Sequence, residues 1–317
     1  MLVIRLDAIG DSLALTPLLA ALQHRNIPVD VVLRQANAGV FSSRAARRVV
    51  VARIDLRSSA RGNLAAIEDL GRDLRPRAYS HVLVATEDPG GYRLAAAVGA
   101  PVRIGFGDPW GKPFKALWSR RLLTEMVYRS AGLDRRGLHE CQVIFSLGAS
   151  LAGAERPTRR LSVLRPLVLE CEPDADERVA VQVTDKWERL RIPFEEIVEL
   201  IRRLSAVGPL RGLSSKLEAA YAERISQATG IAIECFDELE PWKAAIAAAP
   251  AIVTPDSGAM HVAGMVGTPV VAVFPPGRDY ALQVARWFPW AAPHRILRAG
   301  DGWPTRATDA LASLLAS

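Results

Sequence analysis

Short apolar runs alternate with longer amphipathic stretches along nearly the whole chain of 317 residues. In the first half the short runs predict strands at Leu2–Leu6, Val29–Leu33, Val49–Ile54, His81–Ala85 and Val102–Gly105. The stretches between them predict helices that begin near Asp11, Gly39, Asn63 and Gly91. Strands that alternate with helices favour right-handed βαβ units and a parallel sheet.

The second half repeats this pattern. Apolar runs there predict strands at Arg178–Val183, Val207–Arg211, Ile231–Glu234, Ala251–Thr254, Pro269–Phe274 and His294–Leu297. The stretches around them predict helices at Pro193–Ala206, Ser215–Thr229, Pro241–Ala249 and Ser257–Val266. The chain is long enough for two such domains, each with its own core.

The prediction is therefore an α/β protein with two doubly wound, Rossmann-like domains, residues 1–160 and 161–300. The charged, proline-containing stretch Glu155–Pro173 is the expected linker. A cleft between the domains would face the carboxyl ends of both sheets. Residues 301–317 contain one more helical stretch, Thr305–Ala316, which we expect to pack back on the first domain.

Composition narrows the class of protein. Half of the residues are hydrophobic and 23% are charged, as in folded globular proteins. The three cysteines are scattered and form no C-x-x-C pair, which argues against a disulfide framework or a cysteine zinc site. With no signal-like segment and no apolar run of the length that crosses a bilayer, we expect a cytoplasmic protein.

Charge is divided unevenly between the halves. Residues 1–160 hold 24 Lys and Arg against 14 Asp and Glu, whereas residues 161–317 hold 16 against 20. A basic first half suits an anionic partner. The alternative is a set of solvated, arginine-rich helices, because only five of the 40 basic residues are lysines.

An aromatic stripe stands apart in the segment Gly107–Arg121. Trp110, Phe114 and Trp118 follow one another at intervals of four, among four Lys and Arg residues. This spacing is more typical of core packing than of a lipid-facing surface, so we predict that the three rings are buried.

A first chemical motif reads R-L-D-A-I-G-D-S from Arg5 to Ser12. A strand runs into a tight turn, and we expect a helix to open at Asp11. A carboxylate at the carboxyl edge of a sheet can act as a general base towards a hydroxyl. The alternative is that Asp11 only caps the helix.

A second motif reads T-P-D-S-G-A-M-H-V-A-G from Thr254 to Gly264. Ser257 and Gly258 would offer N–H groups and a hydroxyl at a helix N-terminus, which suits a diphosphate. Asp256 can accept hydrogen bonds from sugar hydroxyls. His261, one turn further, would lie on the cleft side or, alternatively, serve only packing.

Together these motifs resemble glycosyltransferase family 9, whose best-known members are ADP-heptose:lipopolysaccharide heptosyltransferases. The resemblance is carried by R-L-D-A-I-G-D-S-L-A-L-T-P early in the chain and D-S-G-A-M-H-V-A-G-M-V-G-T-P-V-V-A-V-F late in it. Arg103–Phe106, His139–Glu140 and Lys186–Trp187 also fall where the family has similar residues. The resemblance implies a GT-B fold and an inverting transfer that needs no metal.

The resemblance also implies roles for single residues. Asp11 would be the catalytic base. Residues of the second half would bind the donor. Lys186 would neutralise the phosphates, with Thr184 just before it in the sequence, and Ser257 and Gly258 would bind the diphosphate. Asp256 would lie near the sugar with His261 close by, and Glu218 would bind the ribose. Fixed N–H dipoles and one ammonium can take the place of a metal at a leaving diphosphate.

Three details bear on this assignment. Asp185, beside Lys186, departs from the family pattern and is expected to weaken the positive field there. Arg278, in the unusual loop Pro275–Asp279, could supplement Lys186. The D-x-D match Asp174–Asp176 precedes a strand instead of following one, so we interpret it as an acidic turn and expect no metal site.

Other functions fit less well. A dehydrogenase would need G-x-G-x-x-G after the first strand, which is absent. An epimerase would need further acid and base residues. A degenerate scaffold that binds nucleotide or glycan without turnover remains the alternative.

The expected partners are a nucleotide sugar, guessed as ADP-heptose, and an anionic glycan or glycolipid acceptor such as a lipopolysaccharide core. The acceptor would place the protein at the cytoplasmic face of the inner membrane. We expect no cofactor and no nucleic acid. The sequence does not select the donor base, the hydroxyl attacked or the oligomeric state.

Overall fold

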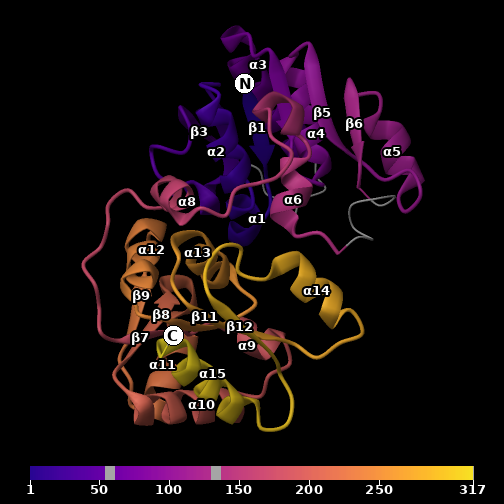
Figure 1. Cartoon of the computed structure of the whole chain (residues 1–317). Helices are drawn as coiled ribbons and strands as arrows, with labels where there is room; N and C mark the ends of the chain where they lie inside the picture. The colour runs from indigo at the N-terminus through magenta and orange to yellow at the C-terminus, as the bar shows by residue number, and fades with distance from the viewer. Residues whose placement is uncertain (54–60, 130–136, 317) are drawn as a thin grey trace. The chain divides into compact units, whose positions relative to one another are not determined.

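The computed structural model describes residues 1–53, 61–129 and 137–316. It divides into two compact units, Met1–Thr158 and Arg159–Ser317, and each is described by itself. Each unit is built on one six-stranded sheet whose neighbouring strands all run parallel (Figure 1). The predicted pair of doubly wound α/β domains is confirmed, with the division two residues before the expected one.

The sheet of the first unit has the strand order β3-β2-β1-β4-β5-β6. Its strands are β1 (Leu2–Arg5), β2 (Asp30–Arg34), β3 (Arg48–Ala52), β4 (His81–Val84), β5 (Val102–Gly107) and β6 (Glu125–Tyr128). From β1 the chain first adds β2 and β3 on one side and then β4 to β6 on the other, so the connections change direction between β1 and β4. The carboxyl ends at such a switch point form the usual ligand crevice of a doubly wound sheet.

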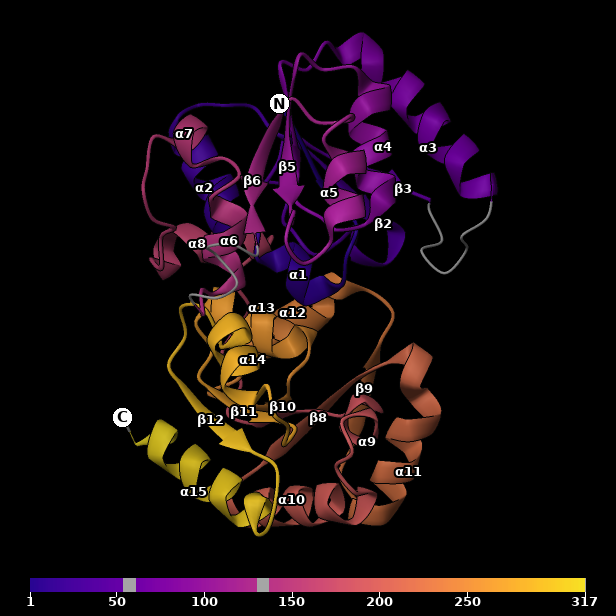
Figure 2. The same cartoon turned by 90° about the vertical axis from the view of Figure 1, so that its right-hand side faces the viewer.

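Helices cover both faces of this sheet (Figure 2). They are α1 (Ile9–Leu13), α2 (Thr16–His24), α3 (Arg61–Leu74), α4 (Pro89–Val98), α5 (Pro113–Ser119), α6 (Glu140–Phe145) and α7 (Ala149–Ala152), with 3₁₀ turns η1 (Gln35–Asn37) and η2 (Arg75–Arg77). On one face α3 and α4 approach so closely that a Cβ at Gly71 would lie 2.3 Å from the Cβ of Ala97. Glycine at this position therefore permits the helix contact.

The second sheet has the order β12-β11-β10-β7-β8-β9, and its connections change direction between β10 and β7. Its strands are β7 (Val179–Gln182), β8 (Leu210–Ser215), β9 (Ile233–Phe236), β10 (Ile252–Pro255), β11 (Val270–Phe274) and β12 (His294–Arg298). Its helices are α8 (Leu161–Val168), α9 (Lys186–Arg189), α10 (Phe194–Val207), η5 (Lys216–Glu218), α11 (Ala219–Thr229), α12 (Leu239–Ala248), α13 (Gly258–Val266), α14 (Tyr280–Trp287) and α15 (Trp303–Leu315). The indoles of Trp187 and Trp303 stack inside this unit with ring centroids 5.6 Å apart, and both are fully buried.

Four sequence predictions need correction. The edge strand β6 was not predicted, because none of its four residues is buried and its apolar run, Met126–Tyr128, is only three residues long. No helix begins near Gly39, where the chain forms turns instead. The expected linker contains α8, whose Leu164, Leu167 and Val168 are buried against the second unit. The strand predicted to reach Ile54 ends at Ala52, and its last predicted residue lies outside the described ranges.

The C-terminal segment also differs from its prediction. Helix α15 packs against α10, β11 and β12 and belongs to the second unit. The prediction of a separate segment 301–317 that returns to the first domain was therefore wrong. Ala307, Leu311 and Leu314 are buried in the core of the second unit, which explains why the helix stays there.

Candidate active site

Asp11 lies at the switch point of the first sheet, on the short helix that follows β1. The helix begins at Ile9, two residues earlier than predicted, and Asp11 is its third residue. One carboxylate oxygen, Oδ2, accepts the Ala8 N–H at 3.2 Å, and the other, Oδ1, accepts from the Arg5 guanidinium at 2.8 Å. Asp11 thus caps the helix. Because its side chain is still 28% exposed, it can also meet a substrate hydroxyl.

Arg5 holds Asp11 from within the sheet. It is the last residue of β1, and its side chain is only 3% exposed. Its guanidinium also donates to the carbonyl of Ala85 and pairs with Asp7 at 3.2 Å and with Glu140 at 3.3 Å. Sequence reasoning assigned Arg5 no role, although a basic residue at the end of an otherwise apolar run was a signal for one.

Glu140 connects this cluster to β6. It is the first residue of α6, fully buried, and pairs with Arg129 at 2.9 Å as well as with Arg5. Burial raises the pKa of Glu140, and the guanidiniums of Arg129 and Arg5 act against that rise. Burial likewise raises the pKa of Asp7, against the effect of Arg5.

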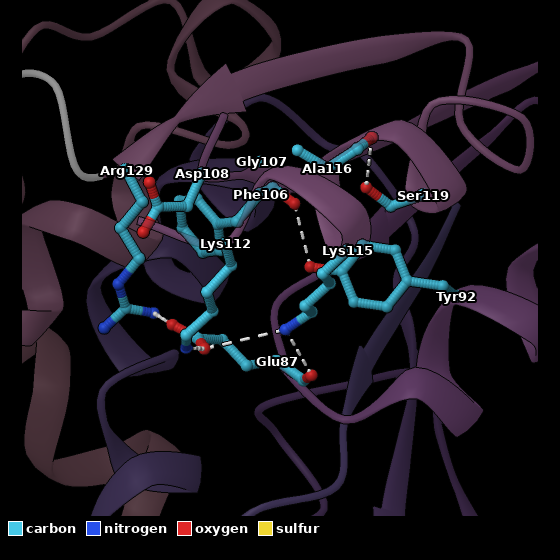
Figure 3. A pocket seen from close by; sticks show the side chains of 10 residues that line it. All are labelled: Glu87, Tyr92, Phe106, Gly107, Asp108, Lys112, Lys115, Ala116, Ser119 and Arg129. Atoms are coloured by element: carbon cyan, nitrogen blue, oxygen red, sulfur yellow. Dashed lines mark hydrogen bonds and ion pairs between the residues drawn. The ribbon is translucent and has the colours of Figure 1, made fainter. Parts of the chain in front are cut away.

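A second group of charges lies after β4 and completes the network (Figure 3). Glu87 pairs with Arg129 at 3.3 Å, with Lys112 at 2.5 Å and with Lys115 at 3.6 Å. Although burial acts in the opposite direction, these cations lower the pKa of Glu87. The pocket around them encloses only about 10 Å³, room for one water molecule. Ion pairs thus link Asp11 through Arg5, Glu140, Arg129 and Glu87 to the start of α5.

The candidate donor residues gather at the switch point of the second sheet. Lys186 follows β7, Glu218 follows β8 and Ser257 follows β10. These three strands are neighbours in the order β10-β7-β8 and run parallel, so their carboxyl ends lie at the same edge. Topology therefore brings together residues that are up to 71 positions apart in the sequence.

Thr184 and Glu218 are in direct contact. The Thr184 hydroxyl donates to Glu218 Oε1 at 2.7 Å, and the Asp185 N–H donates to the same oxygen at 3.1 Å. The Lys186 N–H in turn donates to Thr184 Oγ1 at 3.2 Å. Burial, together with the neighbouring Asp185, raises the pKa of Glu218. The loop after β7 is thus fixed to the element after β8.

The ammonium of Lys186 forms no ion pair within the described parts of the chain. Asp185, the acid expected to weaken its field, pairs with Arg189 at 2.5 Å instead. The two residues are four apart along α9, which is a favourable spacing for an ion pair. The positive charge of Lys186 therefore stays available to an anion.

The second motif forms the strand-to-helix turn that was expected. Ser257 precedes α13, and its hydroxyl lies 2.9 Å from that of Thr254. Gly258 is the first helical residue, so its N–H belongs to the group without an intrahelical acceptor. Asp256 is held to β11 by its own N–H, which donates to the Val273 carbonyl at 3.0 Å.

Three remaining residues are placed as follows. His261, half buried in α13, meets the ring of Trp287 edge-on at 5.5 Å, which favours a packing contribution beside any role at the donor. Arg278 is exposed in the loop after β11. Asp176 precedes β7, as expected from the sequence, and pairs with Arg178 and Arg211.

Comparison with known proteins shows which family the second half of the chain resembles. Residues 193–311 match the model of glycosyltransferase family 9 (heptosyltransferase). The predicted resemblance to family 9 is confirmed. A search of the curated proteins gave no match.

Solved structures share the fold over nearly the whole chain. A family 9 glycosyl transferase from Veillonella parvula superposes with a TM-score of 0.76 at 16% identity, covering 99% of this chain and 96% of that one. The ADP-heptose lps heptosyltransferase II of E. coli gives 0.73 at 19% identity, covering 99% and 98%. E. coli heptosyltransferase WaaC with ADP gives 0.75 at 18% identity, with the same coverage. The GT-B fold is confirmed, and the comparisons support a glycosyltransferase.

Across residues 1–53, 61–129 and 137–316, no helix combines the length and the apolar character that crossing a bilayer requires.

Proposed function

We propose that the chain is an inverting glycosyltransferase that moves a sugar from a nucleoside diphosphate to a hydroxyl of an anionic glycan without a metal ion. The observation that carries the proposal is the donor edge of the second unit. There a lysine without an ion pair in the described chain and the N-terminus of α13 follow neighbouring strands at the switch point. Both features favour a diphosphate.

The leaving group sets the role of these residues. As the bond between the anomeric carbon and the phosphate oxygen breaks, the diphosphate gains negative charge. Lys186 would neutralise that charge, while the Gly258 N–H and the Ser257 hydroxyl would donate hydrogen bonds to phosphate oxygens. Arg278 would add a second cation. Glu218, held by Thr184, would accept a hydrogen bond from the ribose, and Asp256 one from the sugar.

Asp11 would act on the acceptor. Its carboxylate would take the proton of the attacking hydroxyl while the hydroxyl oxygen bonds to the anomeric carbon. Attack opposite to the leaving diphosphate inverts the configuration at that carbon. Arg5 would keep the carboxylate oriented, since its guanidinium donates to Oδ1 of Asp11 in the structure. A general base of this kind contributes about 10²–10⁴-fold to the rate.

Heptose is the expected sugar and ADP the expected nucleotide. WaaC, one of the similar structures, is described with ADP and with ADP-2-deoxy-2-fluoro heptose. For the acceptor we propose an anionic glycolipid such as a lipopolysaccharide core at the cytoplasmic face of the inner membrane. The basic residues of the first half support an anionic acceptor.

Thermal-shift binding without magnesium tests the donor site. ADP-heptose or ADP should stabilise the wild-type chain, and UDP and GDP should do so less. Lys186→Ala should lose most of that shift, whereas Lys216→Ala, which removes an exposed lysine paired with Asp237, should keep it. If no nucleotide shifts the melting temperature, the transferase proposal fails. Nucleotide binding without turnover on any acceptor would indicate the degenerate scaffold instead.

A further inference from the structure

The segment Trp110–Arg121, here called the 110–121 segment, exposes large apolar side chains. It joins β5 to the edge strand β6 and contains α5. Trp110 is 79% exposed, Phe114 is 88% exposed and Leu117 is 60% exposed. The prediction that the aromatic stripe is buried was therefore wrong for Trp110 and Phe114, and only Trp118 packs on the core of the first unit.

This exposure does not come from a poorly packed helix. Ala116 and Ser119 are buried on the inner side of α5, and the ring of Trp118 lies 6.0 Å from that of Tyr92. The turn before the helix is fixed by Asp108, whose Oδ1 accepts the Gly111 N–H at 2.6 Å. Figure 3 shows how Lys112 and Lys115 reach from this segment to Glu87. The inner side of the segment is thus packed against the first unit, while its large apolar side chains point to solvent.

The apolar side chains are of the kind that enters a membrane interface. Phe114 and Leu117 are three residues apart in α5 and so share one face of the helix, and Trp110 precedes them in the turn. A large aromatic side chain presents about 150–250 Å², so Trp110 and Phe114 bring an area comparable to the largest apolar patch of a soluble monomer, about 300–600 Å². Tryptophan and phenylalanine are enriched where proteins meet lipid headgroups.

The charges of the segment favour an anionic surface. Lys112 is half exposed, and Arg120 and Arg121 are exposed. No ion pair holds either arginine within the described residues. Asp108, just before the segment, is the nearest acid in the sequence on that side. Cations beside protruding apolar tips suit anionic phospholipids, because the headgroups attract basic residues while the apolar side chains enter the interface.

We propose that the 110–121 segment docks the first unit on an anionic lipid bilayer. Trp110, Phe114 and Leu117 would enter the interface, while Arg120 and Arg121 would contact lipid phosphates. The proposal deepens the proposed function, since it rests on an acceptor that is itself anchored in a membrane, and it assigns the surface that would reach it. Binding to bare vesicles, however, needs neither donor nor acceptor and can be measured separately.

Co-sedimentation of the full chain with vesicles tests the docking surface. The wild type should bind phosphatidylcholine vesicles that contain about one third phosphatidylglycerol more tightly than pure phosphatidylcholine, and salt should weaken this binding. Replacing the three exposed apolar residues by serine should lower the partition coefficient at least about tenfold. The matched control replaces exposed apolar residues of the second unit by serine, at Val207, Leu282 and Leu315, and should change little.

A second pair of substitutions separates the contribution of charge to vesicle binding from that of the apolar side chains. The double variant Arg120→Gln and Arg121→Gln should weaken binding to the anionic vesicles and leave binding to pure phosphatidylcholine unchanged. Each variant should keep the wild-type melting temperature, because none of the substituted side chains is buried.

Several results would overturn the proposal. The proposal fails if the wild type sediments with neither vesicle, or if the triple serine variant binds as tightly as the wild type. A concentration-dependent dimer that the triple variant abolishes would show that the segment contacts a second copy instead. If vesicle binding holds but no nucleotide shifts the melting temperature, the proposed function fails and the docking surface stands.

Discussion

Replacing Arg5 by methionine tests whether the buried network positions the base. Methionine has nearly the length of arginine, so the variant removes the guanidinium and leaves little empty space. Asp11 loses its 2.8 Å contact, Glu140 loses its ion pair with Arg5, and the Ala85 carbonyl loses a donor. The variant should therefore be less stable and should also hold its base less well.

The size of both effects follows from these contacts. Removing one member of a buried ion pair costs about 3–5 kcal/mol. Glu140 keeps Arg129, and Asp11 is partly exposed, so the lower end, about 3 kcal/mol, is expected. In a unit of this size that loss lowers the melting temperature by roughly 6–12 °C. A base displaced by about 1 Å costs on the order of 10²-fold in rate.

The assay is a double-mutant cycle on the rate of nucleotide release, with Arg5→Met, Asp11→Asn and both together, well below their melting temperatures. If Arg5 acts through Asp11, the double variant should be no slower than Asp11→Asn alone, because the base that Arg5 orients is already gone. Arg5→Lys, which keeps the charge, should recover part of the rate. Donor binding in the second unit should be unchanged in all of them. The positioning role would be refuted if the rate losses of the two single variants multiply in the double variant. It would also be refuted if the rate of Arg5→Met stays within about threefold of the wild type.

Three further predictions concern stability and pH. Burial raises the pKa of Glu140, so its contribution to stability is fully present below its unfolded pKa and is lost as pH rises through the folded value. In the wild type the free energy of unfolding should therefore fall above about pH 4.5, by at most about 1.4 kcal/mol per pH unit. Glu140→Gln should flatten this fall, as measured by urea titrations at several pH values. Trp303→Ala removes the stacking partner of Trp187 and should cost about 3–5 kcal/mol, measured by urea denaturation followed by circular dichroism; a loss below 1 kcal/mol would contradict the buried stack. Gly264→Ala would place a Cβ 2.8 Å from the backbone nitrogen of Trp290 and should lower stability by about 1–3 kcal/mol, whereas Gly230→Ser, open but at positive φ, serves as a control for backbone strain alone.

The order of strands and helices was largely predictable because most strands are buried on both faces. Continuous apolar runs such as Val270–Phe274 leave little choice of local structure. Prediction failed where burial is partial. The edge strand Glu125–Tyr128 carries an apolar run of only three residues. Helix α8 lies within a charged stretch and contains Pro166, which does not favour a helix. The exposed Trp110 and Phe114 show that helical spacing of aromatic residues does not decide which side of a helix faces the core.

The candidate site was predictable only in part. Motifs located Asp11 and Ser257, since each follows a strand directly. The partners of Asp11 could not be found in this way. Glu140 is 135 residues from Arg5, and the packing of α6 against α2 places it near the end of β1. The contact between Thr184 and Glu218 likewise depends on β7 and β8 being neighbours.

Turnover in the presence of EDTA tests the central claim most directly. ADP-heptose and a heptose-free lipopolysaccharide core would be incubated with the wild type, Asp11→Asn and Lys186→Ala, and the glycan product and ADP would be quantified. The account predicts transfer by the wild type without a metal, about 10²–10⁴-fold slower transfer by Asp11→Asn with donor binding intact, and weakened donor binding in Lys186→Ala. A wild type that binds the donor but transfers no sugar, or transfers it only when a divalent metal is restored, would contradict the account.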